Sequence, residues 1–215
     1  MDGPDNGSKE RKRTSGVGMN EVYDKIYKTL DYGPIATARG LSAARHIELL
    51  WHPCKVLCVG CGNGYEAAYL SSIGFDVTTV DYIDPPAKNK KFKSIVGSGQ
   101  SLPFKDNEFN LVVCCECIEH IPPKEISGFL NELKRVATFF YFTVDDEDDP
   151  PYHTHLCIKT PEWWLEKFTM SGFTGKMFKP ASYREKVGTL SCQKVYRKQR
   201  GFNIYGNKVL PKQVQ

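Results

Sequence analysis

The chain has 215 residues, a formal net charge of +4 and eight cysteines. A chain of this length can bury one sizeable core, so we expect a single domain. No apolar run approaches the ~20 residues that cross a bilayer, and the N-terminus has no hydrophobic segment that could serve as a signal peptide. We therefore expect an intracellular protein with no membrane partner, and interpret its cysteines as reduced thiols rather than as disulfides or a zinc site.

The two ends of the chain differ from its middle. Residues 1–18 are polar and carry a basic cluster, which predicts a disordered tail that is either solvated or a nuclear address. We expect the domain at 19–200 and a basic C-terminal tail at 201–215. The chain from Cys192 onward interleaves basic and aromatic residues, a composition that fits an RNA-facing surface or a strand followed by a solvated tail. The location expected is cytoplasmic, or nuclear if the basic start is read as an address.

Between these ends, apolar strand-like runs alternate with amphipathic segments. The expected helices begin at Asn20, cover 36–50, run from the glycine-rich turn to Ile73, follow Pro123 and begin at Pro161, with "YGP" at 32–34 breaking the first of them. The expected strands are 55–60, 75–81, 109–116, 138–144 and 190–197. This alternation predicts an α/β fold with a mainly parallel sheet and helices on both faces.

The segment "VLCVGCGNGYEAAYL" leads from a buried strand through three glycines, Gly60, Gly62 and Gly64, into a helix. Such a turn places backbone N–H groups at the carboxyl edge of a parallel sheet, where doubly wound folds bind ligands. The spacing is shorter than the dinucleotide fingerprint, which disfavours NAD. Asp81 ends the next strand, where a carboxylate can accept both hydroxyls of a ribose. Together they predict a ligand that contains a nucleoside.

These segments, with "VTTVDYID", "GSGQSLPFKDNEFNLVVCCECIEHI" and "HLCIKTPEWWLEKFTMSGF", resemble class I S-adenosylmethionine-dependent methyltransferases of the type 11 group. The resemblance covers roughly residues 45 to 197. It implies a Rossmann-like, doubly wound, mostly parallel seven-stranded sheet whose last strand, Leu190 to Arg197, is antiparallel. The cofactor that it implies is S-adenosyl-L-methionine.

The resemblance also implies which residues hold this cofactor. The glycine turn lines its methionine end, Asp81 binds the ribose, and the loop after Asp81 lies near the adenine. Ser98 stands where many relatives have an acidic adenine contact. The implied cofactor-binding residues are Gly60, Cys61, Gly62, Asn63, Gly64, Asp81, Tyr82, Ile83, Ser98, Gly99, Cys115 and Glu116.

His120 is the candidate general base for methyl transfer, with Glu119 and Glu116 beside it. A sharper alternative is a divalent metal held by Glu116, Glu119, His120 and His155, which resembles the motif of small-RNA 2'-O-methyltransferases and ubiquinone-pathway O-methyltransferases. We favour the reading without metal, in which the Glu-His pair orders its loop. The acidic run 145–149 is interpreted as a solvated loop near the mouth of the site.

The sequence therefore predicts a methyltransferase that acts on an O or N atom of a small-molecule acceptor. Nucleic acid is the less favoured partner. One alternative is a metal-assisted RNA 2'-O-methyltransferase. Another is a catalytically inactive, methyltransferase-like binding or regulatory subunit, suggested by Ser98 and by the cysteine-rich end of the strand at 109–116.

Overall fold

The structure is a computed structural model that describes residues 32–84, 92–148, 154–178 and 202–208. Its helices are α2 (Tyr32–Leu50), α3 (Tyr65–Ser72), α4 (Ile126–Val136) and α5 (Pro161–Met170), with a short 3-10 helix, η1 (Ile118–His120). Its strands are β1 (Lys55–Val59), β2 (Asp76–Asp81), β3 (Lys93–Val96), β4 (Phe109–Cys115), β5 (Ala137–Val144), β6 (Phe173–Phe178) and β7 (Phe202–Lys208). None of the helices in these residues is long and apolar enough to cross a membrane.

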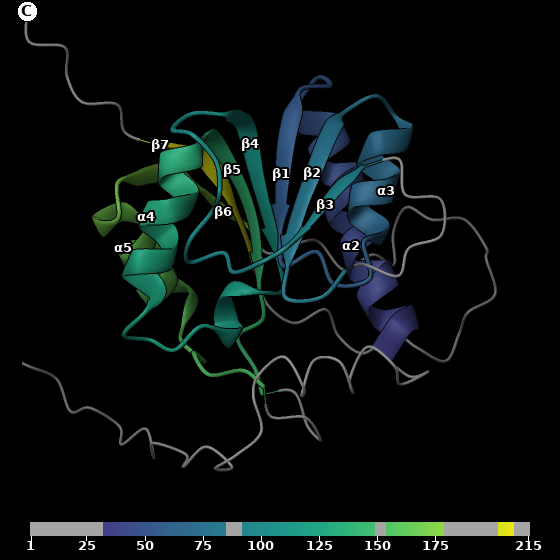
Figure 1. Cartoon of the computed structure of the whole chain (residues 1–215). Coiled ribbons are helices and arrows are strands. Elements are labelled where there is room, and N and C mark those ends of the chain that lie inside the picture. Colours follow the sequence, from purple (N-terminus) through teal and green to yellow (C-terminus); the bar gives the residue numbers. More distant parts are fainter. Residues whose placement is uncertain (1–31, 85–91, 149–153, 179–201, 209–215) are drawn as a thin grey trace, which may run out of the picture.

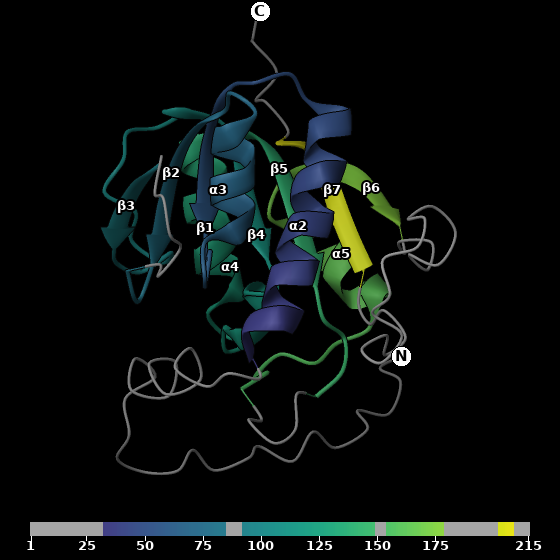
Figure 2. The same cartoon turned by 90° about the vertical axis from the view of Figure 1, so that its right-hand side faces the viewer.

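The strands form one sheet in the order β3-β2-β1-β4-β5-β7-β6. The pairs among β1 to β5 are all parallel, and β7 runs antiparallel to both β5 and β6. The carboxyl ends of the parallel strands therefore share one edge of the sheet, close to which α2 begins (Figure 2). The predicted Rossmann-like, mostly parallel α/β fold is confirmed.

Helices cover both faces of the sheet, with α2 and α3 on one side and α4 and α5 on the other (Figure 1). Alternate residues of β1 point to opposite faces, so Leu57 and Val59 lie in the core on the α4 side, while Val56 and Cys58 lie in the core under α2 and α3. Each large apolar side chain removed from water in this way contributes about 1.5–3 kcal/mol. Both faces of the central strands are consequently buried, as their continuous apolar runs predict.

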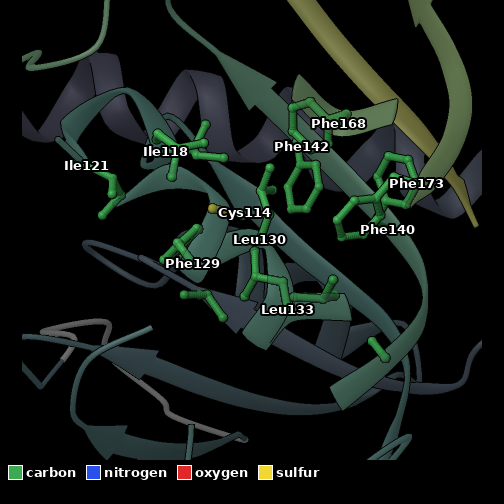
Figure 3. Packing of buried hydrophobic residues seen from close by; sticks show 14 of the residues in the cluster. Cys114, Ile118, Ile121, Phe129, Leu130, Leu133, Phe140, Phe142, Phe168 and Phe173 are labelled. Carbon is green, nitrogen blue, oxygen red and sulfur yellow. The ribbon is translucent and has the colours of Figure 1, made fainter. Parts of the chain in front are cut away.

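The aromatic side chains of β5 meet those of α5 and β6 on the α4 side (Figure 3). Phe140 and Phe142 stack at 5.2 Å, and Phe168 lies 4.9 Å from Phe142 between ring centroids. The start of α5 is determined locally, because the side chain of Thr160 accepts a hydrogen bond from the Trp163 N–H and Pro161 occupies the first turn. The predicted helix start at Pro161 is confirmed.

Several predicted boundaries differ from the structure. α2 begins at Tyr32 and not at residue 36, so "YGP" lies in its first turn, where the missing N–H of Pro34 removes no helical hydrogen bond. The boundary at residue 201 is also wrong, because 202–208 form β7 within the sheet. Polar and glycine residues in "FNIYGNK" hide this strand from a hydropathy pattern. The predicted helix at Asn20, the strand at 190–197 and the tail at 1–18 lie outside the described residues.

Candidate cofactor and acceptor site

The glycine turn between β1 and α3 depends on backbone conformations that other residues rarely adopt. Gly60, Gly62 and Gly64 have φ of 70°, 52° and 75°. A Cβ on Gly60 would also lie 2.3 Å from Sγ of Cys117, which is too close for any side chain. The turn is further fixed by hydrogen bonds from the N–H of Gly60 to the carbonyl of Val80 and from the N–H of Gly64 to that of Cys61. Gly60 is thus required for its left-handed backbone conformation and because a side chain would collide with Cys117.

Asp81 connects the glycine turn to the end of β2. Its Oδ2 accepts a hydrogen bond of 2.8 Å from the N–H of Gly62, and its Oδ1 accepts one of 3.3 Å from the N–H of Ile83. Burial raises the pKa of Asp81, while these backbone hydrogen bonds oppose that shift. The carboxylate is therefore held in a fixed orientation beside the turn, as a ribose-binding role requires.

The next loop lies beside this one. The hydroxyl groups of Tyr82 and Ser98 are 3.5 Å apart, and Ser98 Oγ accepts a hydrogen bond from the N–H of Gln100. At Gly99, a Cβ would lie 2.5 Å from the ring of Phe129 and 2.7 Å from Val59. Close packing of α4 against the sheet is thus a sufficient structural reason for Gly99, whereas Ser98 and Tyr82 stay candidates for contact with a ligand.

The cysteines at the end of β4 have different surroundings. Cys115, one of the implied cofactor-binding residues, has its side chain in the core under α2 and α3, because alternation along β4 directs it there. Cys117 instead lies against the glycine turn at Gly60. Of the two thiols, only that of Cys117 contacts the turn.

Glu116 departs from the regular strand with φ of 49°, a left-handed conformation that costs about 1–3 kcal/mol for a residue with a side chain. Its N–H donates to both the carbonyl and the hydroxyl oxygen of Thr143 on β5. Its carboxylate pairs with Arg39 of α2 at 2.5 Å, and Arg39 also contacts Asp145 at 3.1 Å. These contacts connect α2 to the ends of β4 and β5.

Sequence reasoning missed Arg39 and misplaced Asp145. Asp145 begins the acidic run 145–149, which was interpreted as a solvated loop, yet its side chain is only 4% exposed and faces Arg39. Arg39 lies within a helix and is distant in sequence from Glu116 and Asp145, so no motif identifies it. Its position would have been detectable only as a basic residue on the helix expected to precede the glycine turn.

Glu119 is fully buried directly after β4. Its Oε1 accepts a hydrogen bond from the N–H of Asp145, whereas its Oε2 has no hydrogen-bond partner within the part of the chain that the structure describes. Burial, followed by the charge of Glu116, raises the pKa of Glu119 well above its usual range. The backbone carbonyl of Glu119 accepts from the N–H groups of Leu156 and Cys157, so this residue orders the loop after β5.

Two histidines lie beside Glu119. Nδ1 of His120 is 3.1 Å from the carbonyl of Thr154, and Nδ1 of His155 is 2.5 Å from the carbonyl of Glu147. A carbonyl can only accept, so each Nδ1 is the donor, and in a neutral ring Nε2 then carries the lone pair. The ring centroids are 4.7 Å apart. The two imidazoles thus lie close together, and a backbone carbonyl holds each of them at Nδ1.

A possible metal site is formed by Glu119, His120 and His155. Each offers one potential ligand atom, and these three atoms all lie within 4.8 Å of one another. Backbone carbonyls behind both imidazoles are the usual outer partners of metal-binding histidines. Glu116, the fourth residue of the predicted metal set, is outside this group and is paired with Arg39. The structure therefore brings together three of the four predicted ligands, and their donor set fits a divalent cation such as zinc or manganese.

Residues 57–138, which contain the glycine turn, Asp81 and the Glu-His segment, match the model of a methyltransferase domain family. Over these residues the chain is similar to the type 11 group of methyltransferase domains. This confirms the predicted family and its expected cofactor, S-adenosyl-L-methionine.

The type 11 domain has relatives with different acceptors. It is 33% identical over 97 residues to norajmaline N-methyltransferase of Rauvolfia serpentina, a match that covers 40% of this chain and 32% of that protein. It is 26% identical over 110 residues to the ubiquinone biosynthesis O-methyltransferase of Thiobacillus denitrificans, covering 46% and 47% of the two chains. The chain thus spans a third to a half of the length of these curated relatives.

The fold of the type 11 domain is also that of a solved structure, the Burkholderia thailandensis 1,6-didemethyltoxoflavin-N1-methyltransferase with bound 1,6-didemethyltoxoflavin and S-adenosylhomocysteine. The TM-score is 0.68 at 18% sequence identity, and the match covers 89% of this chain and 88% of the other. At this identity the likeness establishes the shared fold.

Proposed function

We propose that this protein is an S-adenosylmethionine-dependent methyltransferase that methylates an O or N atom of a small-molecule acceptor. The observation that carries the proposal is the hydrogen bond from Gly62 to Asp81, which joins the two cofactor motifs at one edge of the sheet. The family match spans both motifs. The ends of β4 and β5, which carry Glu116 and Asp145, lie at the same edge.

In this proposal the glycine turn lets the cofactor approach the backbone, and Asp81 accepts the ribose hydroxyls. When bound, S-adenosylmethionine supplies an electrophilic methyl group on a sulfonium. The acceptor's lone pair forms the new bond to this carbon while the carbon–sulfur bond breaks and its electron pair stays on sulfur. Nε2 of His120 takes the proton that the acceptor loses. Arg39, Glu116 and Asp145 hold the neighbouring loops in place.

A small-molecule acceptor is supported by the relatives, which include norajmaline N-methyltransferase and ubiquinone biosynthesis O-methyltransferase. The test is calorimetric titration of the full chain with S-adenosylmethionine and S-adenosylhomocysteine, followed by a tritium-transfer assay against a panel of phenols, amines and RNA. Micromolar binding with transfer to phenols or amines supports the proposal. Binding with transfer to RNA alone would show that the acceptor is RNA and not a small molecule. Binding without transfer to any acceptor would favour a regulatory subunit.

A second candidate function, metal-assisted O-methylation with RNA 2'-hydroxyls among the acceptors, is favoured by the group of Glu119, His120 and His155. These residues would hold a divalent cation, which lowers the pKa of an acceptor hydroxyl. Turnover that falls after chelation and returns with manganese or zinc supports this function, provided that S-adenosylhomocysteine binding is unaffected. Turnover unchanged by a chelator would contradict it.

A further inference from the structure

Glu66 is a buried acidic residue that has no role among the predicted site residues or in the methyl transfer described above. It lies in the first turn of α3, two residues after Gly64, and is only 6% exposed. Its Oε1 is buried and has no hydrogen-bond partner among the described residues. Such a group costs free energy unless something pairs with it.

The other oxygen of Glu66 faces α2. A Cβ built on Gly40 would lie 2.9 Å from Oε2 of Glu66, so the glycine lets α2 pass close to this carboxyl group. The α2 helix also carries Arg39, the next residue in the chain. Glu66 therefore lies under the same turn of α2 that reaches Glu116 and Asp145 through Arg39.

Among the described residues, the charges that shift the pKa of Glu66 are negative. Burial raises the pKa of Glu66 to about 8, and the charges of Asp81 and Glu116 add to that shift. Its remaining titratable neighbours are the thiols of Cys58, Cys61 and Cys115, whose own pKa values are raised well above the usual range, first of all by burial. The cation described nearby, Arg39, contacts Glu116 and Asp145. An acidic pocket of this kind favours a cationic ligand.

We propose that Glu66 is the residue that receives the α-ammonium group of the cofactor's methionine end. This inference rests on the proposed function, since it requires the glycine turn to hold the cofactor. An ammonium group has three N–H donors and a positive charge, which match an unpaired buried carboxylate oxygen among acidic neighbours. Glu66 follows the glycine turn directly, so its carboxyl group lies next to the predicted methionine end.

The experiment compares two ligands that share the adenosine and thioether groups. S-adenosylhomocysteine carries the α-ammonium group, and 5'-methylthioadenosine lacks the amino-acid end. For Glu66→Gln we expect the affinity for S-adenosylhomocysteine to fall about tenfold to a hundredfold, and the affinity for 5'-methylthioadenosine to change less than twofold. The control is Glu48→Gln, which alters an exposed acid of α2 that contacts Tyr69.

Equal losses for the two ligands, or no loss for either, would overturn the role of Glu66 while leaving the proposed function intact. If the unmodified protein bound neither ligand, the proposed function would fall together with this inference. A second readout uses the unmodified protein alone: binding of S-adenosylhomocysteine at pH 7 should release a proton, measured as a dependence of the calorimetric heat on buffer ionisation. No proton release would also overturn the inference, even if Glu66→Gln failed to fold.

Discussion

The two halves of the proposed site, one for the cofactor and one for the acceptor, are built in different ways. The cofactor half, at the ends of β1 and β2, is made mostly by backbone: left-handed glycines and amides that hold Asp81. The acceptor half, at the ends of β4 and β5, is made by side chains distant in sequence, in which Arg39 of α2 reaches Glu116 and Asp145. The conformation of a short segment can be predicted from its motif, whereas contacts between residues distant in sequence can be identified only from the folded structure.

The largest effect should come from the acceptor half. His120→Ala is expected to lower kcat about 10²-fold to 10⁴-fold, because the acceptor's proton would lose its receiving group, while S-adenosylhomocysteine affinity stays within about threefold. Initial-rate kinetics and calorimetry on the same preparation test this. His52→Ala, which changes an exposed histidine ahead of β1, is the matched control. Full turnover of His120→Ala would exclude a role as base or metal ligand.

A substitution in the cofactor half should change the affinity for the cofactor. Asp81→Ala is expected to weaken S-adenosylhomocysteine binding about a hundredfold, since it removes charged hydrogen bonds to the ribose and frees the Gly62 amide. Asp76→Ala, at the exposed start of the same strand, should leave the affinity unchanged. An unaltered affinity for Asp81→Ala, measured by calorimetry, would show that the ribose lies elsewhere.

Stability should depend on pH through Glu66. The pKa of Glu66 is about 8 in the folded protein, whereas an unfolded chain loses this proton near the ordinary glutamate value of 4.5, so the free energy of unfolding falls as pH rises between these values. From pH 5 to pH 7 we expect a loss of about 2–3 kcal/mol in the unmodified protein that is absent in Glu66→Gln. Urea denaturation of both proteins tests this. Parallel pH profiles would show that Glu66 titrates normally.

The smallest effect concerns the pairing between α2 and the acceptor half. Arg39→Met is expected to lower the free energy of unfolding by about 1–2 kcal/mol, because it leaves Glu116 and Asp145 without their cation, and the partial exposure of Arg39 limits the loss. Arg45→Met, on an exposed position of the same helix, serves as control. Equal denaturation midpoints for the two variants would mean that these ion pairs add no stability.

Sequence reasoning was most successful where one local rule determines the structure. Continuous apolar runs located β1, β2, β4 and β5, and Pro161 located the start of α5. It failed where tertiary contacts override local preference. β3 has only partly buried residues and no clear pattern, and the strand after residue 201 is completed by pairing with β5.

The same division holds for the site. The glycines, Asp81, Glu119 and His120 lie in motifs, so their residue types and order point to their place at the sheet edge. Arg39 and Glu66 lie on helices with no motif, and their roles depend on which strand ends they face. The side chain of Cys115 lies in the core under α2 and α3, on the face that the alternation along β4 gives it.

The position of β7 has a consequence for biosynthesis. This strand, at residues 202–208, lies between β5 and β6, although both of these precede it in the chain. A ribosome therefore releases β5 with an unpaired outer edge and β6 with no neighbour, and neither can be completed until the segment at 202–208 has emerged. Final closure of the sheet is in this way postponed to a late stage of translation, and during that interval the nascent domain exposes a strand edge that chaperones or aggregation can reach.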